Sequence, residues 1–175
     1  MKVIAISGHA QNGKDTVAGI MERYLKEHGS SVLITHYADL VKYICKTIFG
    51  WDGKKDESGR QLLQYVGTDV VRRKAPDFWV DFIVAVLTLF DGNWDYVLIP
   101  DTRFPNEIDK LKSKGFDVCH LRVVRPNFVS PLTPEQQAHP SETALDNIAP
   151  DFTVVNDGTL DDLNARIVSY MEKRI

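Results

Sequence analysis

Gly8-His9-Ala10-Gln11-Asn12-Gly13-Lys14-Asp15-Thr16 is the stretch of this sequence that decides the fold. It follows the apolar run at residues 3–6 and precedes an amphipathic stretch, so a strand, a glycine-rich loop and a helix are expected in that order. This is the context that a phosphate-binding loop (P-loop) requires. Glycines let the loop curl until several backbone N–H groups face one anion, and the following helix adds the positive end of its dipole.

One position departs from the usual P-loop pattern. A serine or threonine that contacts Mg²⁺ usually follows the lysine, whereas here Asp15 follows Lys14 and Thr16 comes one place later. The alternative is an ordinary turn with a solvated Lys14. The flanking strand and helix patterns favour the P-loop. The residues predicted to bind nucleotide phosphates are Gly8, Asn12, Gly13, Lys14, Asp15 and Thr16.

The composition indicates one soluble globular domain. The 175 residues are 43% hydrophobic and 26% charged, which is ordinary for such a domain, and they suffice for a sizeable core. A net charge of −3 gives no basic field that would favour polymeric nucleic acid as a partner. Residues 78–90 are too short to span a bilayer and contain Asp81, so a buried helix is expected there and no membrane partner.

The start of the chain and its cysteines point to the cytoplasm. The sequence opens directly with a strand pattern, and no signal peptide is apparent. Cys45 and Cys119 match no metal-binding spacing, and we expect them to be reduced, buried thiols.

Strand-length apolar runs alternate with helical stretches, which predicts a parallel sheet flanked by helices. Strands are expected at residues 3–7, 32–36, 96–99, 117–124 and 152–155. Helices are expected at residues 14–27, 39–48 with Asp39 as the cap, 60–73 and 77–90, then after Pro105 and after Thr159.

Residues 126–146 interrupt this alternation with four prolines. Thr133-Pro134-Glu135-Gln136 has the form of a capping box with proline at the first helical position, so short helical turns are expected. Long excursions of this kind are often lids or binding loops, and a flexible surface insertion is an equally weighted alternative.

A carboxylate ends the third predicted strand. Asp101 follows the run at residues 96–99, and in a P-loop fold such an aspartate lies beside the phosphate loop. There it can hold Mg²⁺ through water or accept a proton, although an ordinary turn residue is the alternative. Phosphoryl transfer also needs positive charge. The arginines at strand ends, helix starts and excursion edges are Arg60, Arg103, Arg122 and Arg125. We interpret the run Arg72-Arg73-Lys74 as a solvated helix end.

Together these segments resemble the bacteriophage-type deoxynucleoside monophosphate kinases, a branch of the P-loop nucleotide kinases. The aspartate after the P-loop lysine is normal in that family. Further matching segments lie at residues 61–69, 99–103, 123–126 and 155–160, and residues 139–142 resemble the lid of related kinases. The resemblance implies a five-stranded parallel α/β sheet flanked by helices, with a helical monophosphate-binding part at residues 37–92 and a lid at residues 126–146.

The reaction that this resemblance implies is transfer of the γ-phosphoryl group of ATP to a small deoxynucleoside 5′-monophosphate. The catalytic residues would be Lys14, Asp15, Asp101, Arg103 and Arg125. Asp15 and Asp101 would also hold Mg²⁺ through water. The turn Asn156-Asp157-Gly158 would bracket the adenine. The residues implied for the acceptor are Asp39, Lys42, Arg60, Gln64, Trp79 and Arg103, with core packing the safer expectation for Trp79.

Several alternatives stay open at this stage. Phosphomevalonate and dephospho-coenzyme A kinases share the fold, and some phosphomevalonate kinases also carry a Gly-Lys-Asp loop. A nucleotide-dependent switch would need the loop but not the arginines. The segment between Phe49 and Arg60 is shorter than in the larger phage enzymes, so the accepted bases remain undetermined. A homodimer is also open, and for a phage-encoded protein the location would be the host cytoplasm.

Overall fold

Strand β1 (Lys2–Ser7), which leads into the P-loop, lies at the centre of a five-stranded sheet of order β2-β3-β1-β4-β5. In the computed structural model, which describes residues 1–174, each neighbouring pair of strands is parallel. The other strands are β2 (Val32–Ile34), β3 (Tyr96–Ile99), β4 (Asp117–Val124) and β5 (Phe152–Val155). All five predicted strands are therefore confirmed, although β2 ends two residues before the predicted boundary.

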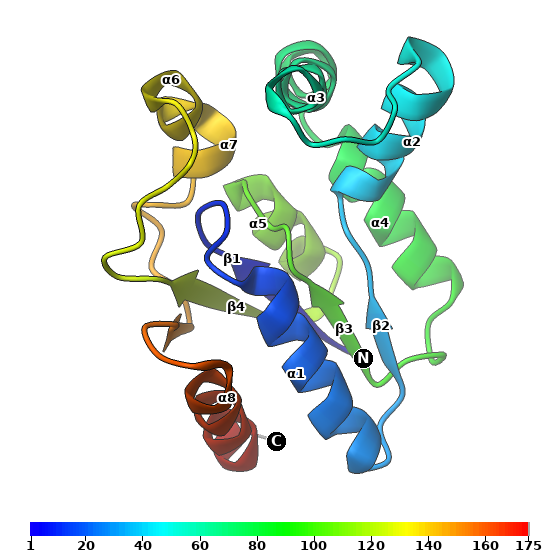
Figure 1. Cartoon of the computed structure of the whole chain (residues 1–175). Coiled ribbons are helices and arrows are strands. Elements are labelled where there is room, and N and C mark those ends of the chain that lie inside the picture. The colour runs from blue at the N-terminus through cyan, green and yellow to red at the C-terminus, as the bar shows by residue number, and fades with distance from the viewer. Residues whose placement is uncertain (175) are drawn as a thin grey trace.

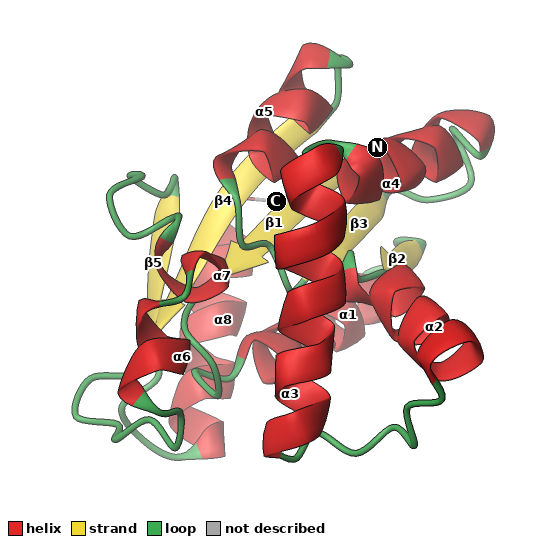
Figure 2. Ribbon diagram, turned by 90° about the horizontal axis from the view of Figure 1, so that it is seen from above, coloured by secondary structure: helices red, strands yellow, loops and turns green. Residues whose placement is uncertain are grey.

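Helices cover both faces of this sheet (Figures 1 and 2). Ile4 and Ile6 pack in the cluster that contains α1 (Lys14–Glu27) and α8 (Leu160–Arg174). Val3 and Ala5 point to the opposite face and pack in the cluster formed with α4 (Phe78–Leu89) and α5 (Pro105–Ser113). Because both faces are covered, residues 3–7 of β1 are all buried, as is typical of a parallel sheet.

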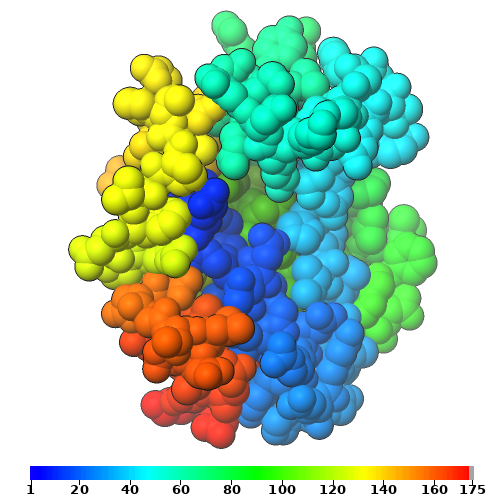
Figure 3. All heavy atoms as spheres, viewed as in Figure 1, coloured from blue at the N-terminus to red at the C-terminus, as the bar shows by residue number. Residues whose placement is uncertain are grey.

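Two groups of helices rise beyond the carboxyl ends of the strands. One consists of α2 (Ala38–Phe49), α3 (Glu57–Gln64) and the π-helical segment η1 (Tyr65–Arg72). The other consists of the short helices α6 (Pro134–Ala138) and α7 (Pro140–Thr143). Figure 3 shows the molecule hollowed between them, with the loop after β1 at the bottom of the hollow.

The helices differ from the sequence expectations in two ways. The predicted helix at residues 60–73 begins earlier, because the Asp56 side chain accepts the N–H of Gly59, and it continues as η1. Helix α4 is covered on one face only, since Phe82 is 47% exposed and Leu89 is 79% exposed. The short turns predicted within residues 126–146 are confirmed, including the capping box at Thr133.

The structure also bears on the cysteines and on membrane contact. Cys45 is buried and Cys119 is half-buried, and both are free thiols. Among the described helices, none has the length and apolar character needed to cross a membrane.

Candidate functional site

The loop after β1 has a backbone that only glycine tolerates at two positions. Gly8 has a φ of +142°, and a Cβ atom there would lie 2.3 Å from the carbonyl oxygen of Val123 on the neighbouring strand β4. Gly13 has a φ of +96° and precedes the first turn of α1. The loop therefore curls tightly against β4 before the helix begins, as a P-loop does.

Lys14 lies inside this curl rather than in solvent. The residue is 8% exposed, and its Nζ atom donates to the carbonyl oxygens of Gly8 at 2.8 Å and His9 at 2.9 Å. Burial, reinforced by the positive charge of Arg103, lowers the pKa of Lys14 to about 7. The amino group of Lys14 is thus held within the loop, where its proton affinity would rise again if an anion were bound beside it.

The turn after β5 is fastened to the same loop. Asn156 donates through Nδ2 to the carbonyl oxygen of Asn12 at 2.9 Å, and Asn12 donates through its own Nδ2 to Val123 at 3.1 Å. A Cβ atom on Gly13 would lie 2.7 Å from the Asn156 amide nitrogen. The predicted adenine turn at residues 156–158 therefore lies directly beside the phosphate loop.

Asp15 begins a chain of polar contacts that leads away from the loop. Its carboxylate accepts a hydrogen bond from Nε2 of His36 at 3.0 Å, and Nδ1 of His36 lies 3.4 Å from Asp39. Lys42 in turn donates to Asp39 at 2.8 Å. The hydrogen bond raises the pKa of His36 and lowers the pKa of Asp15, whose side chain is 82% exposed. Asp15 is thus ionised and accessible, and His36 is a contributor that the sequence did not reveal.

Asp101 holds the start of α2 against the end of β3. Its two carboxylate oxygens accept the N–H groups of Tyr37 at 3.0 Å and Ala38 at 2.9 Å. This corrects the expectation that Asp39 caps the helix, because the cap comes from a strand end 62 positions further along the chain. Burial raises the pKa of Asp101, while the two N–H donors oppose that effect.

Asp15 and Asp101 together fit a magnesium ion better than a transition metal. Among residues 1–174 there is no cluster of three or more His, Cys, Asp or Glu side chains that could hold a metal by itself. Mg²⁺ commonly keeps several waters and is bound through one or two carboxylates plus the phosphates of a substrate. Two carboxylates beside a phosphate loop match that requirement.

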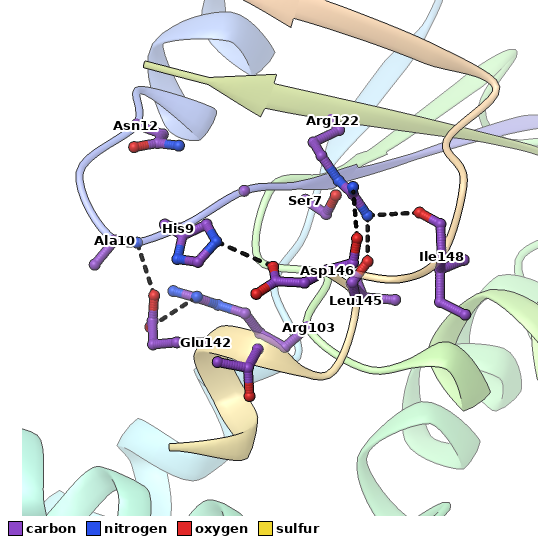
Figure 4. Close-up of polar contacts among 12 residues, drawn as sticks. Ser7, His9, Ala10, Asn12, Arg103, Arg122, Glu142, Leu145, Asp146 and Ile148 are labelled. Atoms are coloured by element: carbon purple, nitrogen blue, oxygen red, sulfur yellow. Dashed lines mark hydrogen bonds and ion pairs between the residues drawn. The ribbon is translucent and has the colours of Figure 1, made fainter. Parts of the chain in front are cut away.

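Glu142, from the short helix α7 in the predicted lid segment, reaches into the loop (Figure 4). Its Oε2 accepts the N–H of Ala10 at 2.8 Å, and its Oε1 accepts a hydrogen bond from Nη1 of Arg103, also at 2.8 Å. Its side chain is 8% exposed, and its negative charge acts on Lys14. The Glu142 carboxylate therefore accepts the hydrogen bonds of a loop amide and a guanidinium that could otherwise be donated to a phosphate group. The sequence marked residues 139–142 as a lid segment but did not predict this contact.

The far end of the predicted lid segment is anchored to the sheet. Arg122 donates to the backbone carbonyls of Leu145, Asp146 and Ile148, and the Asp146 side chain lies 3.0 Å from Nε2 of His9 (Figure 4). Arg122 thus holds backbone rather than substrate.

Arg125 lies on the other side of the loop. Its guanidinium lies 4.5 Å from the centroid of the Phe128 ring, and the residue lines a cavity of about 340 Å³ together with Ala10 and Asn12. The structure therefore places Arg125 next to the phosphate loop.

Two adjoining cavities lie between the strand ends and the α3–η1 helices. One, of about 220 Å³, is lined by Arg60, Gln64 and Arg103 among others. The second, of about 160 Å³, is lined by residues that include Lys42 and Asp101. Five of the six predicted acceptor residues line these cavities, and Asp39 lies beside them through its contact with Lys42.

Trp79 lies at the base of the second cavity, in the core. It is 2% exposed, and its Nε1 donates to the carbonyl oxygen of Gly67 at 2.8 Å. A larger cavity, of about 650 Å³, lies between β5 and α8, but none of the predicted site residues lines it.

The expectation of a solvated basic run at residues 72–74 is wrong for Arg72. Its side chain is only 12% exposed and pairs with Glu107 at 2.5 Å, whereas Arg73 and Lys74 are exposed. The π-helical turn directs Arg72 inward. A proline at the first helical position followed by Glu107 at the third is a capping signal that could have indicated the buried glutamate.

Sequence comparisons find kinases of viral origin. The family model described as deoxynucleotide monophosphate kinase matches residues 23–167, a range that begins after the P-loop. The deoxynucleotide monophosphate kinase of Enterobacteria phage T4 is 30% identical over 92% of this chain and 62% of its own length. A putative deoxynucleotide monophosphate kinase of Acanthamoeba polyphaga mimivirus is 27% identical over 98% of this chain and 97% of its own length. The chain thus spans about three fifths of the phage relative.

Solved structures with a similar fold include kinases. The APS kinase CysC of Mycobacterium tuberculosis, in complex with AMPPNP and APS, has a TM-score of 0.57 at 16% identity, covering 98% of this chain and 97% of that chain. A sugar kinase from Janibacter sp. has a TM-score of 0.56 at 14% identity, with coverages of 98% and 95%. At such identities the likeness concerns the fold alone, and it agrees with the predicted five-stranded parallel α/β architecture.

Proposed function

This chain belongs to the deoxynucleotide monophosphate kinase family, and from that premise we propose that it phosphorylates deoxynucleoside 5′-monophosphates with ATP. An oxygen of the acceptor phosphate attacks the γ-phosphorus of ATP, the bond between that phosphorus and the β–γ bridging oxygen breaks, and ADP leaves. The observation that carries the proposal is the convergence of Arg103 and the Ala10 amide on one carboxylate, Glu142, whose negative charge also acts on Lys14, beside two adjoining cavities.

The donor half of the site is the loop of residues 8–16. Its amides and the positive end of the α1 dipole would bind the β- and γ-phosphates of ATP. Lys14 would neutralise the negative charge that develops on the γ-phosphoryl group during transfer. Thr16, exposed in the first turn of α1, would donate to phosphate oxygens. The turn at residues 156–158, fastened to Asn12, would bracket the adenine.

Magnesium fits the carboxylates at this site. Asp15 and Asp101 would hold its water shell, and the bound ion would neutralise charge on the β- and γ-phosphates. Asp101 keeps its position through its hydrogen bonds to the start of α2, and Asp15 through its hydrogen bond to His36.

The acceptor half lies under α3 and η1. Arg60 and Arg103 line the same cavity and would bind the acceptor phosphate, while the cavity beside it has aromatic walls that include Tyr37 and Phe104. Aromatic walls suit a nucleobase better than the small aliphatic acceptor of a phosphomevalonate kinase. The acceptor phosphate is already anionic, so no strong general base is required.

The lid, residues 126–146, would close over the transferring group. Arg125 would add positive charge there, and closure would exclude the water that otherwise hydrolyses ATP. For the phosphates to reach the Ala10 amide and Arg103, the carboxylate of Glu142 has to leave these donors.

A coupled ADP-release assay tests the proposal. The assay covers all deoxy- and ribonucleoside monophosphates, with mevalonate phosphate and dephospho-coenzyme A as comparison acceptors. We expect turnover with at least one deoxynucleoside monophosphate. Lys14→Met should lose nearly all of it, whereas Lys26→Met, an exposed position on the same helix, should retain it. ATP binding without ADP release for any acceptor would instead favour a nucleotide-binding switch.

A further inference from the structure

A fully buried glutamate lies directly behind the strand end that carries Asp101 and Arg103. Glu107, in the first turn of α5, is 1% exposed, and burial raises the pKa of its carboxyl group to about 7. A carboxylate in such a place is costly unless donors surround it. The identity of these donors therefore indicates what the residue holds in place.

Three donors converge on Glu107. Its Oε2 accepts the backbone N–H of Arg103 at 2.6 Å and of Phe104 at 3.1 Å, while its Oε1 accepts a hydrogen bond from Nη2 of Arg72 at 2.5 Å. The first of these bonds fixes the backbone of the residue whose guanidinium reaches into the phosphate site. Glu107 thus sets the course of the chain through Arg103 without touching the phosphate site itself.

Arg72 connects this carboxylate with the opposite wall of the acceptor cleft. The residue ends η1, and its guanidinium lies 3.9 Å from the centroid of the Phe104 ring. Its Nε atom is buried without an acceptor among residues 1–174. Arg72 and Glu107 both line the cavity of about 160 Å³, together with Thr68 of η1 and Asp101. The ion pair therefore joins the two walls of that cavity.

The π-helical form of η1 accounts for the inward position of Arg72. A π turn contains more residues than an α turn, so the side chains that follow it are rotated relative to those of a continuous α-helix. Such turns occur frequently at functional sites. Here the turn directs one arginine of a basic run inward, while Arg73 next to it is exposed.

We propose that Glu107 and Arg72 form a positioning pair that holds Arg103 against η1. The pair thereby fixes the site of the acceptor phosphate relative to the site of the acceptor base. The inference rests on the proposed kinase reaction and deepens it. Neither residue reaches the reacting atoms, and both act through the backbone of Arg103 and the position of η1. The pair serves the acceptor half of the site, since its own hydrogen bonds reach the backbone of Arg103 and Phe104 rather than the donor loop at residues 8–16.

The test is the double variant Arg72→Met/Glu107→Gln. It removes both charges, so that no unpaired ion is left in the interior, and it keeps an oxygen that accepts the two amides. We expect cooperative unfolding and AMPPNP affinity within about twofold of the wild-type protein. The value of kcat/KM for the deoxynucleoside monophosphate should fall about 100-fold, the size of effect that a misplacement of about 1 Å produces.

Two further variants complete the experiment. Arg72→Lys keeps the charge but loses the planar guanidinium group, and we expect an intermediate fall in kcat/KM of about tenfold. If the double variant does not fold, this variant tests the positioning role by itself, and an unchanged kcat/KM would overturn that role. Lys110→Met, which removes the two ion pairs that Lys110 of the same helix α5 forms with Asp77 and Asp81, should leave kcat/KM unchanged.

The possible outcomes separate this inference from the proposed function. A folded double variant with kcat/KM within about threefold of wild type would overturn the positioning role, as would an equal loss of AMPPNP affinity, which indicates a general structural defect. A wild-type protein that phosphorylates no monophosphate would overturn the proposed reaction and this inference with it.

Discussion

Replacing Lys14 with methionine should make the protein more stable while it abolishes phosphoryl transfer. The lysine is 8% exposed, and burial brings its pKa from 10.5 down to about 7. A lysine whose folded pKa lies below its unfolded value destabilises the fold. That penalty is fully present below about pH 7 and disappears as the pH rises toward 10.5.

The expected gain follows from these values. The difference between the two pKa values corresponds to about 5 kcal/mol. The hydrogen bonds from Nζ to the carbonyls of Gly8 and His9 offset about 1.5 kcal/mol each. Lys14→Met keeps most of the apolar stem and removes the charge, so a net stabilisation of about 2 kcal/mol is expected near pH 6, or a rise in Tm of about 4–8 °C.

Thermal unfolding followed by circular dichroism at about pH 6 and about pH 10 measures this effect. The gain should shrink or reverse at the higher pH, where the folded protein already holds a neutral lysine. Lys26→Met, an exposed position on the same helix, serves as the control and should show no such dependence. A gain of equal size at both pH values, or a less stable variant at about pH 6, would refute the reasoning.

Three other outcomes are expected. Glu142→Gln should tighten ATP binding about tenfold in titration calorimetry, because the carboxylate competes with phosphate for its donors; weaker binding would show that it assists instead. Gly8→Ala should cost about 3 kcal/mol in urea unfolding, whereas Gly92→Ala, at positive φ but in open space, should cost about 1 kcal/mol, and equal losses would contradict the close approach to β4. Asp15→Asn should lower the pKa of His36 toward its ordinary value in an NMR titration, and an unaltered pKa would contradict the pairing. The stability that the Asp15–His36 pair contributes should be fully present below the ordinary histidine pKa and be lost as the pH rises through the raised pKa of His36.

The central strands β1 and β3 could be predicted closely because they are buried on both faces and form continuous apolar runs in the sequence. Strands β4 and β5 are only partly buried, and they too begin and end where the sequence placed them. Helix bounds were less certain. The start of α2 depends on Asp101, a cap from a distant strand end that local sequence does not show.

Contacts between distant segments account for what the sequence could not show. Arg72 stands in a basic run and reads as solvated, until η1 turns it toward a glutamate 35 positions away. Nothing in the local sequence distinguishes Glu142 from its neighbours, because its partner Ala10 lies 132 positions earlier in the chain. The residue type indicates the charge in each case, whereas the partner depends on the tertiary fold. The roles of the predicted site residues in binding and catalysis remain predictions.

The hydrogen bond between Asn156 and Asn12 also constrains when the protein becomes competent during synthesis. Asn156 follows the last strand to be made, and β1 pairs with β3 and β4 rather than with β2, its neighbour in sequence. Pairings over such long sequence separations form slowly, because the intervening chain must be ordered first. A nascent chain that ends before β5 would carry the complete glycine-rich loop and still lack the hydrogen bond from Asn156 to Asn12. Nucleotide binding should therefore appear late on the ribosome, when β5 has emerged and docked.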